Sequence, residues 1–218
     1  MEKEYKAVLY HADGYYEEKK SRFYADLFPA SSEEEVDRYL SGIRKKYYDA
    51  SHHCYAYTFG KRQEYVKCSD AGEPQGTAGY PMLSVLQGAG ICDCLVVVTR
   101  YFGGTLLGTG GLVRSYTKAA QDAVGNAVIA HKKLSDLLLV KTGYGEYGKL
   151  QYYFEKAGLK PSASDFTDVV TIQLPVPVDD TERVVKAITE ETNGKASIET
   201  LKQIYSALVG KETMLFDS

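Results

Sequence analysis

The chain of 218 residues is 44% hydrophobic and 25% charged, and its formal net charge is −3. Its length exceeds the roughly 100–150 residues of a typical single domain, and its composition is that of a globular protein. No apolar run approaches the roughly 18 residues of a membrane span, and the charged N-terminus lacks the apolar core of a signal peptide, so we expect a cytoplasmic protein without a membrane partner. The acidic balance argues against bulk nucleic-acid binding, and any RNA contact therefore requires a local basic patch.

The first third of the chain alternates between strand-like and helix-like periodicity. Ser32 with Glu35 three residues later is a capping box, which predicts a helix ending near Tyr47. The strands expected around it cover residues 5–11 and 18–27, joined by a turn at residues 13–14, and residues 52–59 and 64–68, which form a hairpin.

Further along, a proline in the first turn predicts a short helix over residues 80–86, and an apolar run predicts a buried strand over residues 93–99. A helix follows over residues 112–124. Together these elements indicate an α+β domain with a mostly antiparallel sheet and its helices on one face.

From Leu134 onward the pattern changes to the order βαββαβ, which is typical of a ferredoxin-like domain. Its expected strands cover residues 137–142, 160–165, 169–176 and 196–201, and its helices cover residues 147–157 and 181–192, the latter capped by Asp180. We therefore predict two domains, 1–131 and 132–218. The second shows no obvious cluster of chemically active residues.

A glycine-rich loop follows the buried strand and leads into the next helix. Arg100 and Arg114 flank it. The residues expected to bind a ligand there, besides these arginines, are Gly103, Gly104, Gly108, Gly110, Gly111 and Leu112. Backbone N–H groups at glycines and at a helix N-terminus suit an anion, and we expect those of residues 110–112 to have no protein acceptor. Purely structural glycines would serve only tight turns and close packing.

A second loop, residues 69–79, is also glycine-rich but acidic. Asp70 and Glu73 are its candidate catalytic or ligand-binding carboxylates, and Gly76 and Thr77 are further candidates for ligand contact. Neither loop fits a named nucleotide fingerprint. We expect one of the two flanking arginines to pair with Asp70 or Glu73, which would hold the two loops together.

Cysteines and tyrosines offer weaker signals. Cys54 and Cys68 lack the spacing of a zinc or redox site, and strand alternation places Cys54 and His53 on opposite faces, which argues against a catalytic pair. We expect no zinc, flavin or nicotinamide cofactor and no metal. The 19 tyrosines offer rings for base stacking, although amphipathic strand and helix positions account for most of them.

Four motifs in this order resemble the signature of the IMPACT/YigZ family. They are Lys20-Ser21-Arg22-Phe23, the run from His53 to Gly60, the acidic loop Ser69-Asp70-Ala71-Gly72-Glu73-Pro74, and the run from Thr99 to Arg114. The chain departs from the pattern at Ala71, where the family usually has Asp, and at Ser115, where Ala is commoner. The resemblance implies a first domain like the second domain of small-subunit ribosomal protein five. It also implies a second domain similar to the C-terminal domain of elongation factor G.

Three functions remain open. The resemblance implies a translation-linked regulator that binds RNA, the ribosome or a translation-related protein through a cleft between the loops, as a monomer or weak dimer. An enzyme acting on a phosphorylated or nucleotide-like small molecule would use Arg100 and Arg114 for the anion and Asp70 or Glu73 as base or magnesium ligand. A protein-interaction module would use the glycines only structurally.

Overall fold

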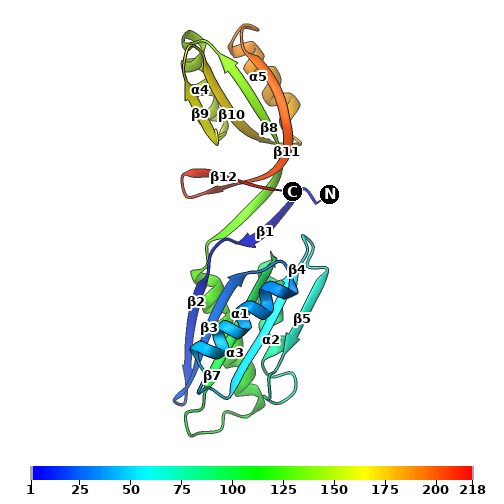
Figure 1. The fold of residues 1–218 in the computed structure, drawn as a ribbon, viewed down its shortest axis with the longest axis vertical. Coiled ribbons are helices and arrows are strands. Elements are labelled where there is room, and N and C mark those ends of the chain that lie inside the picture. Colours follow the sequence, from blue (N-terminus) through cyan, green and yellow to red (C-terminus); the bar gives the residue numbers. More distant parts are fainter. Residues whose placement is uncertain (1, 218) are drawn as a thin grey trace. The chain divides into compact units, whose positions relative to one another are not determined.

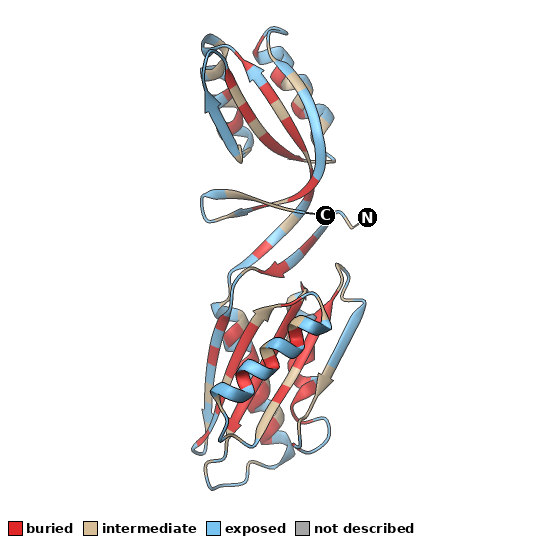
Figure 2. Cartoon of the chain, in the orientation of Figure 1, coloured by how far each residue is buried: buried red, intermediate tan, exposed pale blue. Residues whose placement is uncertain are grey.

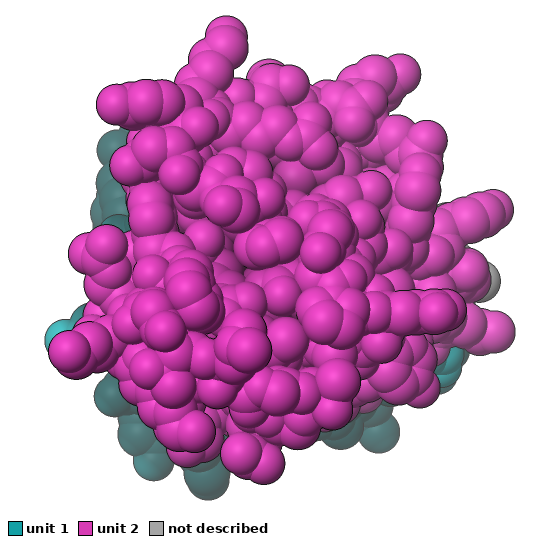
Figure 3. All heavy atoms as spheres, turned by 90° about the horizontal axis from the view of Figure 1, so that it is seen from below, with its two compact units in different colours: residues 1, 3, 131–218 teal, residues 2, 4–130 magenta. Residues whose placement is uncertain are grey.

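The computed structural model describes residues 2–217 and divides into two compact units. The N-terminal unit consists of Glu2 and residues 4–130, and the C-terminal unit consists of Lys3 and the residues from His131 onward (Figure 3). The predicted domain boundary, after His131, falls inside a strand. Met1 and Ser218, the outer limits of the two predicted domains, lie outside the described residues.

The N-terminal unit is a five-stranded antiparallel sheet with helices on both faces (Figure 1). Its sheet strands, in spatial order, are β2 (Ala12–Glu18), β3 (Ser21–Pro29), β7 (Cys94–Tyr101), β4 (His52–Phe59) and β5 (Tyr65–Ser69). Its helices are α1 (Glu33–Lys46), α2 (Gly79–Ala89) and α3 (Gly108–Asn126). A separate short parallel pair joins β1 (Glu4–Val8) to β6 (Ile91–Cys92).

The central strand β7 explains why both faces carry helices. Its even-numbered residues, Val96 and Val98, pack with α2 and α3, whereas Leu95 and Val97 pack with α1. Because successive residues of a strand point to opposite faces, an unbroken apolar run needs cover on both sides. This strand is buried from Cys94 to Arg100, and its last residue, Tyr101, is half-buried (Figure 2). The prediction that the helices lie on one face was wrong.

The hairpin of β2 and β3 also differs from the prediction. Its turn lies at Lys19 and Lys20, whose φ angles are 48° and 65°, and not at Asp13 and Gly14. Gly14 lies within β2, where a Cβ would come within 2.3 Å of the Ala123 backbone nitrogen in α3. That glycine therefore permits close packing of helix on sheet and makes no turn. By contrast, β4 and α1 match their predicted ranges closely.

The C-terminal unit has the predicted order βαββαβ with one strand added. Its elements are β8 (Ile129–Thr142), α4 (Tyr144–Ala157), β9 (Ala163–Phe166), β10 (Val170–Pro177), α5 (Thr181–Glu191), β11 (Ser197–Val209) and β12 (Glu212–Phe216). The strands form an antiparallel order β9-β10-β8-β11-β12, and both helices contribute to one apolar core with β8 and β10. β11 is far longer than predicted, and β12 was missed. The prediction that Asp180 caps α5 was wrong, since its side chain makes no cap bond and its Oδ1 accepts from Arg183 at 2.8 Å.

Candidate functional site: two glycine-rich loops

A buried ion pair joins the end of β7 to the acidic loop, residues 69–79. The Arg100 Nη1 atom lies 2.7 and 3.0 Å from the two carboxylate oxygens of Glu73. Both side chains are buried, with exposures of 8% and 3%. The guanidinium also lies 5.6 Å from the Phe23 ring centroid and 5.7 Å from that of Phe102. The prediction that one flanking arginine pairs with a loop carboxylate is confirmed for this pair.

Two further buried groups complete the surroundings of Glu73. The Tyr116 hydroxyl, on α3, donates to Glu73 Oε1 at 2.8 Å, and the Cys54 Sγ lies 3.3 Å from that hydroxyl. Burial raises the pKa of the Cys54 thiol to about 12, so the thiol stays protonated at neutral pH. A protonated, buried thiol is not a nucleophile, which agrees with the expectation that Cys54 has no catalytic role.

His53 lies on the other face of β4, as strand alternation predicts. Its Nδ1 atom is 3.1 Å from Thr99 Oγ1, whereas the Cys54 thiol faces Tyr116. Within residues 2–217, no group of three or more His, Cys, Asp and Glu side chains is placed to hold a metal ion. Sequence reasoning overlooked Tyr116, although its position four residues after the apolar Leu112 marks the buried side of the helix.

Asp70 lies in the loop before α2, and its side chain caps the N-terminus of that helix. Its Oδ1 accepts from the backbone N–H groups of Ala78 and Gly79 at 2.9 and 2.8 Å, and its Oδ2 accepts from that of Gly76 at 2.8 Å. Partial burial raises the pKa of this carboxyl, but the three N–H donors outweigh that effect and hold it below the ordinary value of 3.8. Residue 78, the N-cap of α2, is an alanine without a side chain that can cap. Asp70 supplies the missing acceptor.

The polar side chains of the acidic loop therefore bind partners within the protein. Asp70 and Glu73 are the two candidate catalytic carboxylates, and both accept hydrogen bonds from protein donors. Thr77 is similarly occupied, since its hydroxyl donates to the Pro74 carbonyl at 2.6 Å. This arrangement offers a structural role for each residue and leaves neither carboxylate in a position to act as an exposed base.

The glycine loop, residues 103–112, has physical reasons for several of its glycines. A Cβ on Gly103 would lie 2.1 Å from the Lys20 carbonyl carbon, so only glycine allows the loop to cross the β2–β3 turn. The Gly103 N–H donates to Ser21 Oγ at 3.1 Å. Gly104 and Gly108 adopt φ angles of 84° and 66°, the left-handed region that glycine enters without strain. The loop therefore crosses the β2–β3 turn at Gly103 and reaches α3 through two glycines in the left-handed region.

The start of α3 lacks a cap. The helix begins at Gly108 after Leu107, and no side chain accepts a hydrogen bond from its first turn. An α-helix leaves its first N–H groups without intrahelical acceptors, and these reach as far as Gly110. Arg114 is exposed, and its Nη1 lies 3.6 Å from the point where a Gly110 Cβ would stand. Within residues 2–217, the Arg114 guanidinium forms neither an ion pair nor a hydrogen bond.

This start differs from the predicted one. We expected the helix to begin at Leu112 and to leave the N–H groups of residues 110–112 free of protein acceptors. Because the helix begins earlier, the N–H groups of Gly111 and Leu112 fall inside its hydrogen-bonded turns, and the uncapped donors are those of residues 108–110. An anion bound at this helix would therefore meet the N–H groups of residues 108–110, and not those of Gly111 and Leu112.

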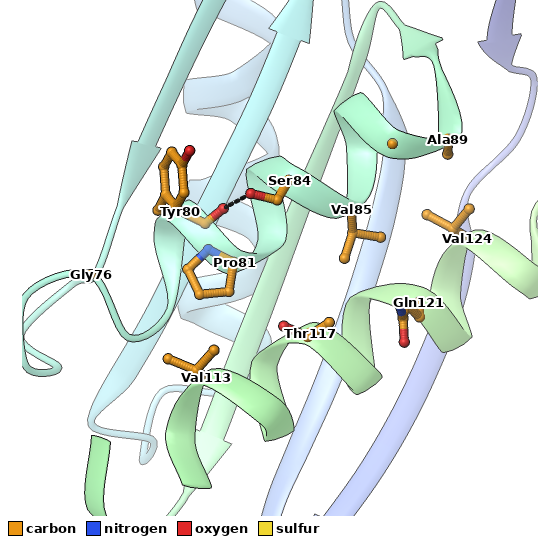
Figure 4. A pocket seen from close by; sticks show the side chains of 11 residues that line it. Gly76, Tyr80, Pro81, Ser84, Val85, Ala89, Val113, Thr117, Gln121 and Val124 are labelled. Carbon is orange, nitrogen blue, oxygen red and sulfur yellow. Dashed lines mark hydrogen bonds between the residues drawn. The ribbon is translucent and has the colours of Figure 1, made fainter. Parts of the chain in front are cut away.

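A groove of about 640 Å³ lies between α2 and α3 (Figure 4). Pro81 and Val85 line it from α2, and Val113, Thr117 and Val124 line it from α3. No charged side chain is among the lining residues. In Figure 4 the valine side chains of both helices point into the groove.

Of the residues predicted to bind a ligand, only Gly76 lines this groove. The residues of the glycine loop lie outside its walls, as do Arg100 and Arg114. The structure thus presents two separate surfaces near the loops, the uncapped start of α3 and the uncharged groove.

Comparison with known proteins identifies the family. The Impact N-terminal domain matches residues 19–124, and a domain of unknown function (DUF1949) matches residues 140–195. The IMPACT family member YvyE of Bacillus subtilis is 34% identical over 180 residues, which make up 83% of each chain. The chain belongs to the IMPACT family.

Other relatives extend this placement. The Protein IMPACT homolog of Dictyostelium discoideum is 43% identical over 97 residues, which are 42% of this chain and 27% of that protein. A crystal structure described as that of an hypothetical protein shares 27% identity and covers 93% of this chain and 99% of its own, with a TM-score of 0.59. In this IMPACT family chain, no described helix has both the length and the apolar character needed to cross a membrane.

Proposed function

We propose that this IMPACT family protein is a translation-linked regulatory factor that binds RNA or a ribosome-associated partner through the start of α3. The observation that carries the proposal is the exposed Arg114 beside the uncapped N–H groups of residues 108–110. The family resemblance supplies the link to translation.

The chemistry of this surface suits a phosphate. Free N–H groups at a helix N-terminus and the helix dipole favour an anion, and a guanidinium adds paired donors with a permanent positive charge. The β2–β3 turn, with Lys19 and Lys20, lies against the same loop at Gly103. We propose that these two lysines and Arg114 supply the local basic patch that an acidic protein needs for an RNA contact.

The acidic loop does not oppose such a contact with free carboxylates. The Glu73 charge is matched by Arg100, and Asp70 accepts from three backbone N–H groups. These partners offset the two negative charges, so the repulsion that they exert on an approaching phosphate is reduced.

The fold supports the proposal at a coarser level. The βαββαβ order of the C-terminal unit is compatible with the proposed likeness to the C-terminal domain of elongation factor G. We also propose that the N-terminal unit is similar to the second domain of small-subunit ribosomal protein five. The proposed domains cover residues 1–131 and 132–218. Such analogies link folds without establishing activity. We further propose that the protein acts in the cytoplasm and is a monomer or weak dimer.

The test is a titration of short RNA into the full chain at low and at moderate salt. Arg114→Ala should weaken binding and make the negative slope of log K against log salt shallower by about 1, because one phosphate contact is lost. Arg38→Ala is the matched control, since Arg38 is an exposed arginine of the same unit on α1. Equal binding by both variants, or no binding by the wild type, would overturn the proposal. Binding of ATP without RNA would favour the small-molecule enzyme.

The uncharged groove favours a second candidate, a protein-interaction module. Val113 and Arg114 are neighbours on α3, yet the first lines the groove and the second is exposed beside the helix start. Capture from a lysate with and without nuclease separates the two surfaces. Val113→Asp should abolish nuclease-resistant protein capture if the groove binds a partner, whereas Arg114→Ala should affect only nuclease-sensitive capture.

A further inference from the structure

Four tyrosines lie on the face of the N-terminal sheet that carries α1. They are Tyr15 on β2, Tyr24 on β3, Tyr101 on β7 and Tyr47 at the C-terminal end of α1. Tyr15 is paired with Tyr24 across the β2–β3 ladder, and Tyr101 is paired with Arg22 across β3 and β7. We call these four residues the tyrosine cluster.

The rings of the tyrosine cluster form one continuous aromatic surface. Tyr24 stacks on Tyr47 with ring centroids 5.7 Å apart and an interplanar angle of 22°. Tyr15 lies 5.2 Å from Tyr24, and Tyr101 meets Tyr24 edge-on at 6.0 Å. Tyr15 is 44% exposed, and the other three rings are partly exposed.

Hydrogen bonds hold two of these rings in place. The Tyr15 hydroxyl donates to Glu17, and the Tyr101 hydroxyl donates to Asp49, both at 2.6 Å. The bond to Glu17 raises the pKa of Tyr15 to about 12, and the bond to Asp49 does the same for Tyr101. The rings therefore stay neutral at physiological pH. Their fixed orientation lowers the entropy lost when a planar ligand stacks on them.

Two cations lie against the cluster. The Arg22 guanidinium is 5.2 Å from the Tyr101 centroid, and Lys46 Nζ is 4.7 Å from the Tyr47 centroid. Glu17 and Asp49 balance much of this positive charge. Attraction to phosphate is therefore modest at the cluster, and a ligand must gain most of its binding energy there from stacking.

We propose that the tyrosine cluster is a stacking platform for unpaired bases of single-stranded RNA. The inference rests on the proposed function and deepens it, because Tyr101 is followed directly by the loop that leads to Arg114. Neutral rings held in fixed orientations suit base stacking, which tolerates any sequence because every base has a π-face. The cluster and α3 belong to opposite faces of the sheet, so a single strand that used both would pass around the end of β7.

The experiment measures fluorescence anisotropy of a labelled oligoadenylate of about eight nucleotides, titrated with the full chain. Tyr24→Ala and Tyr15→Ala should each weaken binding by about 5- to 150-fold, the range for loss of one stacked base. Tyr24→Phe keeps the ring and should bind within about twofold of the wild type. Tyr65→Ala is the matched control, since Tyr65 is 71% exposed on β5 of the same unit, outside the cluster.

A second probe separates stacking from charge. An abasic strand of the same length keeps the phosphates, so wild type and Tyr24→Ala should bind it equally, with lower affinity than the wild type shows for oligoadenylate. Thermal unfolding checks that each variant is folded, and the exposed Tyr15 provides a substitution with little effect on the core.

The outcomes distinguish this inference from the proposed function. If the tyrosine variants bind oligoadenylate like the wild type while Arg114→Ala is weakened, the stacking platform is wrong and the phosphate contact stands. If the wild type binds neither strand, both are wrong. Loss of oligoadenylate binding in Tyr24→Ala but not in Tyr24→Phe supports the platform.

Discussion

Two glycine-rich loops of the N-terminal unit each lead into a helix, and the two helix starts differ in what caps them. At α2 the Asp70 carboxylate accepts from three backbone N–H groups. At α3 no side chain performs that task, and the exposed Arg114 lies beside the uncapped turn. Similar glycine content therefore produces one loop whose polar groups bind each other and one whose donors remain available. The difference lies in the placement of carboxylates and not in the glycines.

The largest expected difference concerns the buried pair. Glu73→Ala leaves Arg100 charged and unpaired in a buried site and removes the acceptor of Tyr116, so we expect a loss of about 3–5 kcal/mol in the free energy of unfolding. Urea denaturation at neutral pH measures it. Arg114→Ala, on the open loop, should change stability by no more than about 0.5 kcal/mol. Comparable losses in the two variants would contradict the contrast between the loops.

A rescue experiment sharpens the same point. Combining Glu73→Leu with Arg100→Met replaces the buried charges by apolar side chains of similar size, and such exchanges are often neutral for stability. We expect the double variant to be clearly more stable than Glu73→Ala. If it is equally unstable, the pair does more than balance charge within the core.

The next effect is the cap of α2. Asp70→Asn removes the charge that three N–H donors face, and we expect a loss of about 1–3 kcal/mol at neutral pH. The folded-state pKa of Asp70 lies below its ordinary value of 3.8, so its contribution is present above that pH and disappears as pH falls through the folded pKa. The stability gap between wild type and Asp70→Asn should therefore narrow below about pH 3.8, as urea midpoints across a pH series would reveal. A gap that widens with acidification would refute the capping role.

A smaller effect is expected at Ala71, where the chain departs from the family pattern. Its φ angle of 44° lies in the left-handed region, which costs an L-residue about 1–2 kcal/mol. Ala71→Gly should therefore stabilise the protein by about 1 kcal/mol. Gly104→Ala provides the mirror experiment, since its φ is 84° and a Cβ there would meet nothing within 4 Å, so only backbone strain of about 1 kcal/mol is added. Thermal melts of both variants should shift in opposite directions.

Much of the sheet and of the buried pair follows from periodicity. β4 and α1 match their predicted positions because residue alternation and the Ser32 cap are local signals. Arg100 shares the parity of Val96 and Val98, so the sequence already places it on the face that α2 and α3 bury. Its pairing with a loop carboxylate was therefore predictable, although the choice between Asp70 and Glu73 depended on the loop's path.

The failures have a common cause, since they depend on contacts between elements. The turn at Lys19 and Lys20 contains neither glycine nor asparagine, so the sequence does not indicate it. Gly14 suggests a turn, but its function is to allow close packing against α3. β12 was missed although Gly210, with φ of 61°, marks its turn, because its residues Glu212–Phe216 show no alternation of polar and apolar side chains and it is defined by its pairing with β11. The tyrosine cluster is equally invisible in sequence, because its members come from three strands and a helix end.

The smallest expected effect is at Ser115, the second departure from the family pattern. Ser115 is fully buried, and its hydroxyl donates to the Gly111 carbonyl one turn back at 2.9 Å. That carbonyl also lies within the hydrogen-bonded body of α3, so Ser115→Ala leaves no buried acceptor without a partner. Alanine has the higher helix propensity, and the two contributions nearly cancel. We expect a change of less than about 0.5 kcal/mol in urea denaturation and unchanged RNA binding. A loss beyond about 1 kcal/mol would show that the hydroxyl positions the start of α3, and would make the open loop as dependent on side-chain bonds as the closed one.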